Sequence, residues 1–267
     1  MPYEVAGKHV LVTGASSGIG AALAEGLAER GAIVGLCARR RDRLAEVLAR
    51  VRRHSPESKM WTVDLSDLDG ICAFARRASE DLGGVDVLVN NAGIPKRRAV
   101  QELTPEVVEA VMAINFFSPV RLTLALLPEV IERSGRIVNV SSVAARLGPP
   151  AEAAYTASKA ALTGWSESMQ VDLSETDVRV HVVNPGVFDT ELFDQPDNDD
   201  MIARVDALPP TAVIEPIIEQ LRSDTFEIYV PEWFANVVGG KFPDTTAYFE
   251  GTVSWLRAER AAREAEG

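Results

Sequence analysis

Short apolar runs alternate with longer segments of helical periodicity from residue 8 to about residue 190, and this alternation restricts the fold more than any other feature. A repeating strand and helix pattern predicts a parallel sheet covered by helices. The runs are rich in Val, Ile and Leu with little polar alternation, which is typical of strands buried on both faces. We therefore predict an α/β fold with a doubly wound, mainly parallel sheet of seven strands and helices on both faces.

The predicted strands are His9–Val12, Ile33–Cys37, Met60–Val63, Val85–Val89, Arg136–Val140, Val178–Val183 and Phe226–Val230. The predicted helices carry apolar residues at three-to-four spacing and are Ile19–Arg30, Arg41–Arg53, Leu68–Leu82, Pro105–Arg133 and Ala154–Glu175. The Ala, Glu and Arg residues of 257–267 resemble a frayed helix end. No linker or repeat divides the chain, so we expect a single domain over 1–267.

Charge and cysteine usage exclude several classes of protein. The chain has 39 acidic and 27 basic residues, a net charge of -12, which repels nucleic acid and anionic membrane surfaces. Cys37 and Cys72 lack CxxC spacing, and the histidines lie too far apart for a local metal signature, so we expect no disulfide and no metal. The N-terminus lacks secretory features, and the apolar run around 124–127 is short for a membrane helix. We expect a cytoplasmic protein.

A glycine-rich turn, TGASSGIG at residues 13–20, follows the first predicted strand and opens a helix. Glycines there permit a tight turn and bring backbone N–H groups to a pyrophosphate, which the helix N-terminus also favours. An ordinary strand-to-helix connection is the alternative interpretation. We predict a Rossmann-type dinucleotide site whose phosphate-binding turn contains Gly14, Ser16, Ser17, Gly18, Ile19 and Gly20.

The end of the second predicted strand indicates which dinucleotide binds. Dinucleotide folds place an acidic residue about 20 positions past the glycines to bind the ribose 2′-hydroxyl. Ala38 stands there, followed by Arg39 and Arg40, whose guanidinium groups suit a 2′-phosphate. NADP(H) is therefore preferred and NAD(H) stays possible, because neutral Ser17 offers no further cation. Alternatively, Arg39–Arg43 form the solvated basic start of a helix.

Tyr155 and Lys159 lie four positions apart on a predicted helix, so both side chains project from one face. An ammonium group that stabilises a phenolate would lower the tyrosine pKa from about 10 toward neutrality and prepare it for proton transfer. Outside a pocket, the same spacing describes an ordinary surface pair.

Seven motifs occur in an order that resembles the classical short-chain dehydrogenase/reductase family. They are TGASSGIG, Asp64-Leu65, Asn90-Asn91-Ala92-Gly93, Asn115, Ser141-Ser142, YTASK at 155–159, and Asn184-Pro185-Gly186 with Thr190. The match spans residues 7–190, about 70% of the chain. The resemblance implies an NAD(P)-dependent oxidoreductase that interconverts a carbonyl and an alcohol. It also implies a cofactor-binding and catalytic core at 1–190 and a variable substrate-lid and C-terminal region at 191–267.

The resemblance assigns a catalytic tetrad. Tyr155 would donate the proton in carbonyl reduction or accept it in alcohol oxidation, and Ser142 would hold the substrate oxygen. Lys159 would bind the nicotinamide ribose and lower the tyrosine pKa, while Asn115 would hold a water that links the lysine to solvent.

The resemblance also assigns cofactor contacts along the strand ends. They are Asp64 and Leu65 at the adenine, Asn91, Ala92 and Gly93 beside the adenine ribose and phosphates, and Pro185, Gly186, Val187 and Thr190 at the nicotinamide carboxamide. Hydride transfer from the B face of the ring is implied as well.

The segment 226–255 departs from the family's ketoreductases because it is longer and holds 8 of the 17 aromatic residues. We predict a lid containing Phe188, Leu192 and Phe193, and a cap on a hydrophobic substrate pocket drawn from Trp233, Phe234, Phe242, Tyr248 and Phe249. Packing of these aromatics against the core or a partner subunit is the alternative. Small residues at 157, 160, 161 and 164 make a smooth helix face, and the family implies a homodimer or homotetramer.

The alternatives to an NADP-preferring reductase are an NAD-linked alcohol dehydrogenase and a catalytically silent dinucleotide-binding regulatory protein. The complete tetrad favours an enzyme over the regulatory protein.

Overall fold

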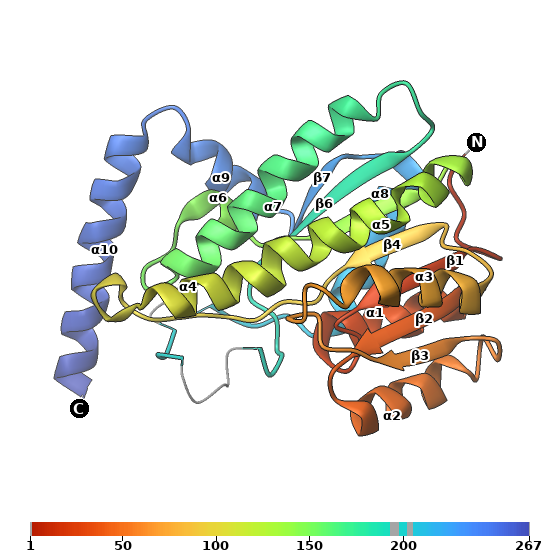
Figure 1. Cartoon of the computed structure of the whole chain (residues 1–267). Helices are drawn as coiled ribbons and strands as arrows, with labels where there is room; N and C mark the ends of the chain where they lie inside the picture. Colours follow the sequence, from red (N-terminus) through yellow and green to blue (C-terminus); the bar gives the residue numbers. More distant parts are fainter. Residues whose placement is uncertain (1, 193–197, 202–204, 267) are drawn as a thin grey trace.

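The computed structural model describes residues 2–192, 198–201 and 205–266, and these contain a seven-stranded sheet in the order β3-β2-β1-β4-β5-β6-β7 (Figure 1). Every neighbouring pair is parallel, so the sheet is entirely rather than mainly parallel. The strands are β1 His9–Thr13, β2 Ile33–Ala38, β3 Lys59–Thr62, β4 Val87–Asn90, β5 Arg136–Val140, β6 Arg179–Pro185 and β7 Glu227–Val230. The predicted fold class is confirmed.

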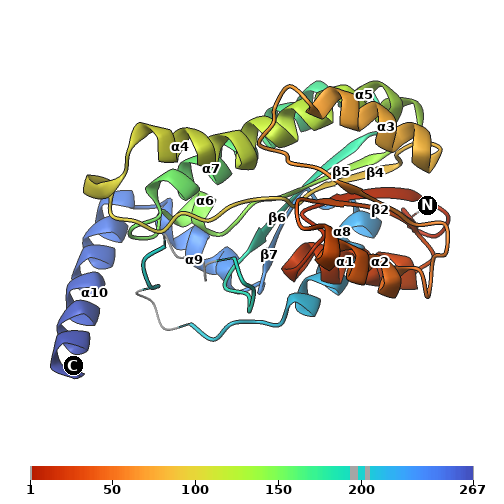
Figure 2. The same ribbon diagram turned by 60° about the horizontal axis from the view of Figure 1, so that its bottom comes forward.

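Helices cover both faces of the sheet (Figures 1 and 2). One apolar layer joins the sheet to α1 Gly18–Glu29, α2 Arg41–Val51 and α8 Ile214–Ser223. The other joins it to α3 Ile71–Leu82, α5 Ser118–Glu132 and α7 Ala153–Asp172. Successive side chains of a strand point to opposite faces, so Val10 and Val12 enter the first layer and Leu11 the second. Burial on both faces explains why the strands are apolar without alternation.

The predicted helix 105–133 is divided in the structure. It consists of α4 Pro105–Met112, a π-helical turn at Ala113–Phe117, and α5. The run Pro105–Glu132 is long and apolar enough to cross a membrane by length and composition, with 44% of its apolar window buried. Because α5 packs on α3 in the layer that covers the sheet, this run is the core helix of a soluble fold.

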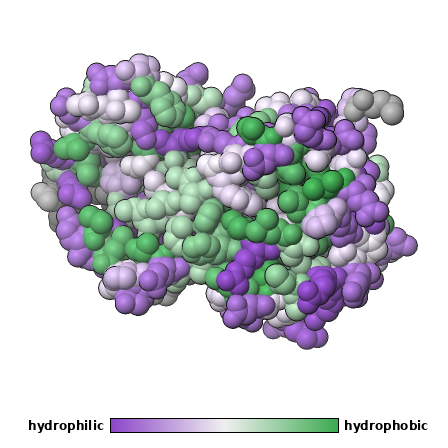
Figure 3. Space-filling view, turned by 45° about the horizontal axis from the view of Figure 1, so that its top comes forward, coloured by the Kyte–Doolittle hydropathy of each residue, from purple (hydrophilic) through white to green (hydrophobic). Residues whose placement is uncertain are grey.

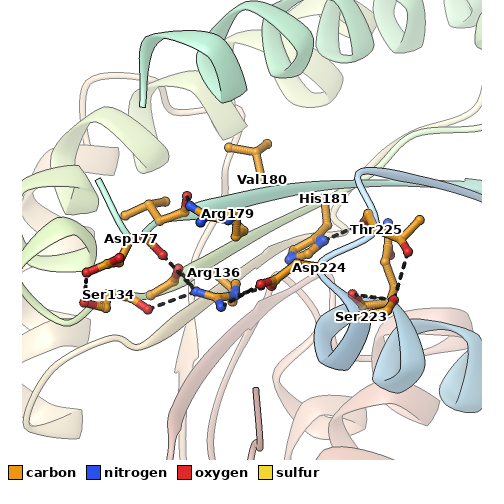
Figure 4. Close-up of polar contacts among 12 residues, drawn as sticks. Ser134, Arg136, Asp177, Arg179, Val180, His181, Ser223, Asp224 and Thr225 are labelled. Atoms are coloured by element: carbon orange, nitrogen blue, oxygen red, sulfur yellow. Dashed lines mark hydrogen bonds and ion pairs between the residues drawn. The ribbon is translucent and has the colours of Figure 1, made fainter. Parts of the chain in front are cut away.

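The edge of the sheet where the strands begin is held by a polar network (Figure 4). Arg136, at the start of β5, donates from Nε to Asp224 Oδ1 at 3.1 Å, just before β7. The His181 ring on β6 makes a 2.9 Å hydrogen bond from Nδ1 to the Thr225 carbonyl. Burial lowers the pKa of His181 to about 4, so the imidazole is neutral and Nδ1 carries the donated proton. These contacts tie the starts of the last three strands together.

The C-terminal region continues beyond β7 as two helices, α9 Phe234–Lys241 and α10 Thr245–Glu266. Both views show α10 at the end of the molecule remote from β3 and α2 (Figures 1 and 2). Residues 257–266 of the segment expected to be a frayed helix end are therefore part of a long helix that begins at Thr245. The short elements are α6 Ala144–Leu147 and two 3-10 turns, Val100–Glu102 and Pro210–Val213.

Candidate active site

A cavity of about 1220 Å³ opens where the strands end, on both sides of the point where the strand order reverses between β1 and β4. Ligands of open α/β sheets bind in this crevice because the loops after adjacent strands diverge there. The cavity wall contains every residue predicted for the site except Gly20 and Asn115, which lie behind it. The structure thus brings together residues from 14 to 190 of the sequence.

The glycine turn is built for close approach of backbone. Gly14 and Gly18 have φ of 67° and 56°, in the left-handed region that glycine adopts without strain. A Cβ on Gly20 would lie 2.4 Å from Asn91 Nδ2, which donates to the Thr13 carbonyl at 2.9 Å. The bare backbone that opens α1 at Gly18 therefore lines the cavity, as pyrophosphate binding requires. These features fit a dinucleotide.

Thr13 holds this turn to the end of β4, a role that the sequence analysis missed. Its Oγ1 accepts from the backbone N–H groups of Asn91 at 3.0 Å and Ala92 at 2.9 Å. The same hydroxyl donates to the Val89 carbonyl at 3.2 Å. The sequence signal that could have indicated this role is the position of Thr13 directly before Gly14.

Ala38, Arg39 and Arg40 line the cavity where β2 ends, as predicted. Arg40 donates from Nη2 to Ser17 Oγ at 2.5 Å and from Nη1 to Glu191 Oε2 at 2.9 Å. Arg43 Nη1 also contacts the Glu191 carboxylate. The sequence analysis did not select Glu191 or Arg43, which are 148 positions apart along the chain.

Asp64 and Leu65 line the cavity after β3. The Asp64 carboxylate accepts from the Ser66 backbone N–H at 2.9 Å and from Ser66 Oγ at 2.7 Å. These hydrogen bonds favour the charged form and hold the Asp64 pKa below its usual value. An ionised carboxylate can accept a hydrogen bond from an adenine amino group.

Ser142, Tyr155 and Lys159 meet in the wall of the cavity. Ser142 follows β5, and its hydroxyl accepts a hydrogen bond from the Ala144 backbone N–H at 3.1 Å. Lys159 lies one turn further along α7 with its Nζ 5.9 Å from the Tyr155 ring centroid. All three side chains are buried, so the tyrosine and lysine are not an ordinary surface pair.

The pKa of Tyr155 is a correction to the sequence prediction. Burial, the largest cause, raises it above its ordinary value, and the nearby Glu152 carboxylate raises it further. The Ser142 hydrogen bond and Arg97 act in the opposite direction, but they do not overcome burial. Burial brings the Lys159 pKa down to about 8, and Nζ donates to the Val140 carbonyl at 2.8 Å.

Asn115 lies on the π-helical turn, a feature that is frequent at functional sites. Its Oδ1 accepts from the Ile94 backbone N–H at 2.8 Å, and its Nδ2 donates to the Ile94 carbonyl and to Ser158 Oγ, each at 3.0 Å. Gly93 lies close to both Asn115 and Lys159. A Cβ added at Gly93 would be 3.2 Å from Asn115 Oδ1 and 3.5 Å from Lys159 Nζ. The amide therefore joins the loop after β4 to α7.

A buried ion pair that the sequence analysis missed forms another part of the wall. Arg97 Nε lies 3.1 Å from Glu152 Oε1, with 7% and 10% of the two side chains exposed. Arg97 also accepts at its carbonyl from Asp199 N at 2.8 Å, and its N–H donates to Asn198 Oδ1 at 2.8 Å. The position of Glu152 directly before α7 and three residues before Tyr155 was the available signal.

Residues 185–192 complete the cavity after β6. Pro185, Gly186, Val187 and Thr190 all line it. Gly186 lies directly against the Phe234 ring, because a Cβ there would be 2.3 Å from Phe234 Cε2. Asp189 N donates to the Leu208 carbonyl at 2.8 Å, which holds this segment beside residue 208.

Four of the eight residues predicted for the lid and cap line the cavity. Phe188, Leu192, Phe234 and Tyr248 line the cavity, together with Trp255, which the sequence analysis did not select. Phe193 lies outside the described residues. Three residues of the predicted cap are absent from the wall and are exposed: Trp233 at 50%, Phe242 at 61% and Phe249 at 45%. Among the described residues, no group of His, Cys, Asp and Glu side chains could hold a metal ion.

The comparisons with known proteins agree with this geometry. Residues 8–200 match the family model for short chain dehydrogenase. Nodulation protein G of Rhizobium sp. (strain N33) is 36% identical over 208 residues, which are 78% of this chain and 84% of that protein.

Two solved structures are similar over most of their length. A short chain dehydrogenase/reductase from Burkholderia phymatum in complex with NAD has a TM-score of 0.83 and 25% identity, covering 91% of this chain and 95% of that one. A short chain dehydrogenase from Burkholderia cenocepacia J2315 in complex with NADP has a TM-score of 0.80 and 28% identity, covering 94% and 99%.

The chain belongs to the short-chain dehydrogenase/reductase family and is an NAD(P)-dependent oxidoreductase.

Proposed function

We propose that the protein is an NADP-preferring reductase that interconverts a hydrophobic ketone or aldehyde and the corresponding alcohol. One observation carries this proposal: Ser142 and Tyr155 line the same cavity as the glycine turn. Two donors on one wall can hold a single carbonyl oxygen, and the nicotinamide cofactor supplies the hydride when it is bound.

The proposed chemistry assigns a role to each side chain of the tetrad. Ser142 donates a hydrogen bond to the substrate oxygen and fixes it beside Tyr155, which passes its phenolic proton to that oxygen as the alcohol forms. Burial raises the Tyr155 pKa, so the phenol carries its proton at neutral pH. Lys159 binds the cofactor ribose, and Asn115 holds the loop after β4 against α7.

The preference for NADP rests on the end of β2. Ala38 places no carboxylate there to bind a ribose 2′-hydroxyl, and the guanidinium groups of Arg39 and Arg40 suit a 2′-phosphate. The solved relatives include complexes with NAD and with NADP. Arg39→Ala tests the preference: it should weaken NADP much more than NAD, and equal weakening would favour the NAD-linked alcohol dehydrogenase instead.

The substrate end of the cavity supports an apolar substrate. Phe188, Leu192, Phe234, Tyr248 and Trp255 line the cavity together with Tyr155, so a fatty, steroid-like or aromatic carbonyl compound could bury its surface against them. In this division of a single domain, residues 1–190 supply the cofactor site and the catalytic groups, and residues 191–267 supply most of the substrate wall.

We further propose a cytoplasmic homodimer or homotetramer that joins through α5 and α7. Leu124 on α5 and Val171 on α7 are exposed at 57% and 71%, and Ala157, Ala160 and Gly164 are exposed along α7. Figure 3, which brings the side of α5 and α7 forward, shows apolar surface across the middle of this face. Gly164→Arg should lower the oligomeric state in light scattering, because a Cβ at Gly164 meets no atom within 4 Å inside the subunit.

The direct test of the function is a panel of aliphatic, aromatic, sugar and steroid carbonyl compounds. Turnover of each compound is measured as the loss of NADPH absorbance. We expect turnover of apolar ketones or aldehydes by the wild type and its loss in Tyr155→Phe. Cofactor binding without turnover across the whole panel would instead support the catalytically silent regulatory protein.

A further inference from the structure

The carboxylate of Glu191, in the segment after β6, pairs with two arginines at the end of β2 and the start of α2. Glu191 follows Thr190 directly in the segment after β6, and its carboxylate contacts Arg40, which precedes α2, and Arg43 in the first turn of α2. Glu191 and Arg40 both line the cavity. The two arginines hold the pKa of the Glu191 carboxyl below its usual value, so it is ionised at neutral pH.

The Arg40 guanidinium connects the glutamate to the glycine turn. Nη1 donates to Glu191 Oε2 at 2.9 Å, while Nη2 donates to Ser17 Oγ at 2.5 Å and approaches Ser16 Oγ at 3.3 Å. Ser16 and Ser17 belong to the phosphate-binding turn. Arg40, one of the two arginines expected to pair with a 2′-phosphate, therefore already has a carboxylate partner from another segment.

A 2′-phosphate and a carboxylate require the same donors. Both are anions that guanidinium groups bind through charge-assisted hydrogen bonds. If NADP uses Arg40 or Arg43, its phosphate must displace the Glu191 carboxylate or accept its repulsion. NAD has no 2′-phosphate, so it has no corresponding competition.

We propose that Glu191 is a specificity-determining residue that reduces the preference for NADP over NAD by competing with the 2′-phosphate for Arg40 and Arg43. This inference rests on the proposed function because it takes the cavity to be the dinucleotide site. The ion pairs are about half exposed. Exposed pairs have modest strength, so removing the Glu191 charge should tighten NADP binding by about threefold to tenfold.

The experiment compares equilibrium binding in wild type and Glu191→Gln. Dissociation constants for NADPH and NADH are measured by titration calorimetry, together with those of 2′,5′-ADP and 5′-ADP, which isolate the adenine end. We expect E191Q to tighten NADPH and 2′,5′-ADP while NADH and 5′-ADP change less than about twofold. The gain should shrink as salt is raised, because salt screens exposed charges.

Glu215→Gln is the matched control. Glu215 pairs with Arg30 on the surface and does not line the cavity. Removing its charge should therefore leave the ratio of NADPH to NADH affinity unchanged. An unchanged ratio of NADPH to NADH affinity in E191Q, or weaker NADPH binding, would overturn the inference and leave the proposed function standing. If the wild type binds neither dinucleotide, the proposed function fails and this inference fails with it.

Discussion

Removal of Arg97 tests how strongly the buried ion pair holds the wall beside Tyr155. The pair with Glu152 has an N–O distance of 3.1 Å, and 7% and 10% of the side chains are exposed. Arg97→Met leaves the Glu152 carboxylate buried without this cation, and breaking a buried pair in this way costs about 3 to 5 kcal/mol. The hydrogen bond from Arg97 Nη1 to the Asp199 carbonyl at 3.4 Å is lost as well.

The double variant R97M/E152L separates the two contributions. It removes the unpaired charge, so the cost that remains comes from the other contacts of Arg97, which include the hydrogen bond to Asp199, worth about 1 kcal/mol. The free energy of unfolding is measured by urea titration followed by circular dichroism, at one fixed protein concentration. We expect the double variant to be more stable than R97M by about 2 to 4 kcal/mol, because it no longer buries an unpaired carboxylate.

The pH dependence gives a second readout of the same charge. Burial raises the pKa of Glu152 and Arg97 lowers it, so in R97M the pKa rises further. A group whose folded pKa lies above its unfolded value stabilises the fold at low pH, and that stability is lost as pH rises through the folded pKa. The penalty of R97M should therefore shrink as pH falls from about 7.5 toward 5. Equal penalties for R97M and the double variant, with no such pH dependence, would refute the reasoning.

Three further predictions concern the proposed machinery. Tyr155→Phe removes the phenolic proton and should lower kcat/KM for carbonyl reduction by about 10²- to 10⁴-fold without weakening NADPH binding, and near-normal turnover would exclude Tyr155 as the acid. Lys159 has a folded pKa of about 8, below its unfolded value, so the unfolding free energy of the wild type should rise between about pH 8 and 10. Lys159→Met should not show this rise. Parallel curves of unfolding free energy against pH for the two proteins, measured by urea titration, would contradict the burial argument. Gly20→Ala places a Cβ 2.4 Å from Asn91 Nδ2, so it should lower the free energy of unfolding by about 1 to 3 kcal/mol and weaken NADPH binding. Gly240→Ala is the control, because a Cβ there meets no atom within 4 Å. Equal thermal midpoints for the two variants would count against the close approach at Gly20.

The π-helical turn at Asn115 shows where sequence periodicity stops being informative. Apolar spacing predicted one continuous helix over 105–133, and the chain is helical from Pro105 to Glu132. The wider turn at Ala113–Phe117 carries Asn115, whose amide satisfies both backbone groups of Ile94. Ile94 belongs to a separate loop, so the contact is not visible in the local pattern.

For Tyr155 and Lys159, the spacing in the sequence predicted their common location but not their pKa values. Their spacing predicted a shared helical face, and both side chains line the cavity. The predicted lowering of the Tyr155 pKa was wrong because desolvation of the phenolate is the largest effect on its pKa. Burial is a property of the assembled fold and has no counterpart in the spacing of two residues.

The sequence alone determined the parallel α/β fold, the glycine turn and the set of residues that meet at the strand ends. These depend on periodicity and on local backbone requirements, which act over a few neighbouring positions. Only the tertiary structure decided that Arg97 pairs with Glu152, that Glu191 reaches Arg40 and Arg43, and which aromatic residues face the cavity. Such contacts join segments far apart along the chain, and their energies depend on distance and burial that exist only once the sheet and its helices have packed.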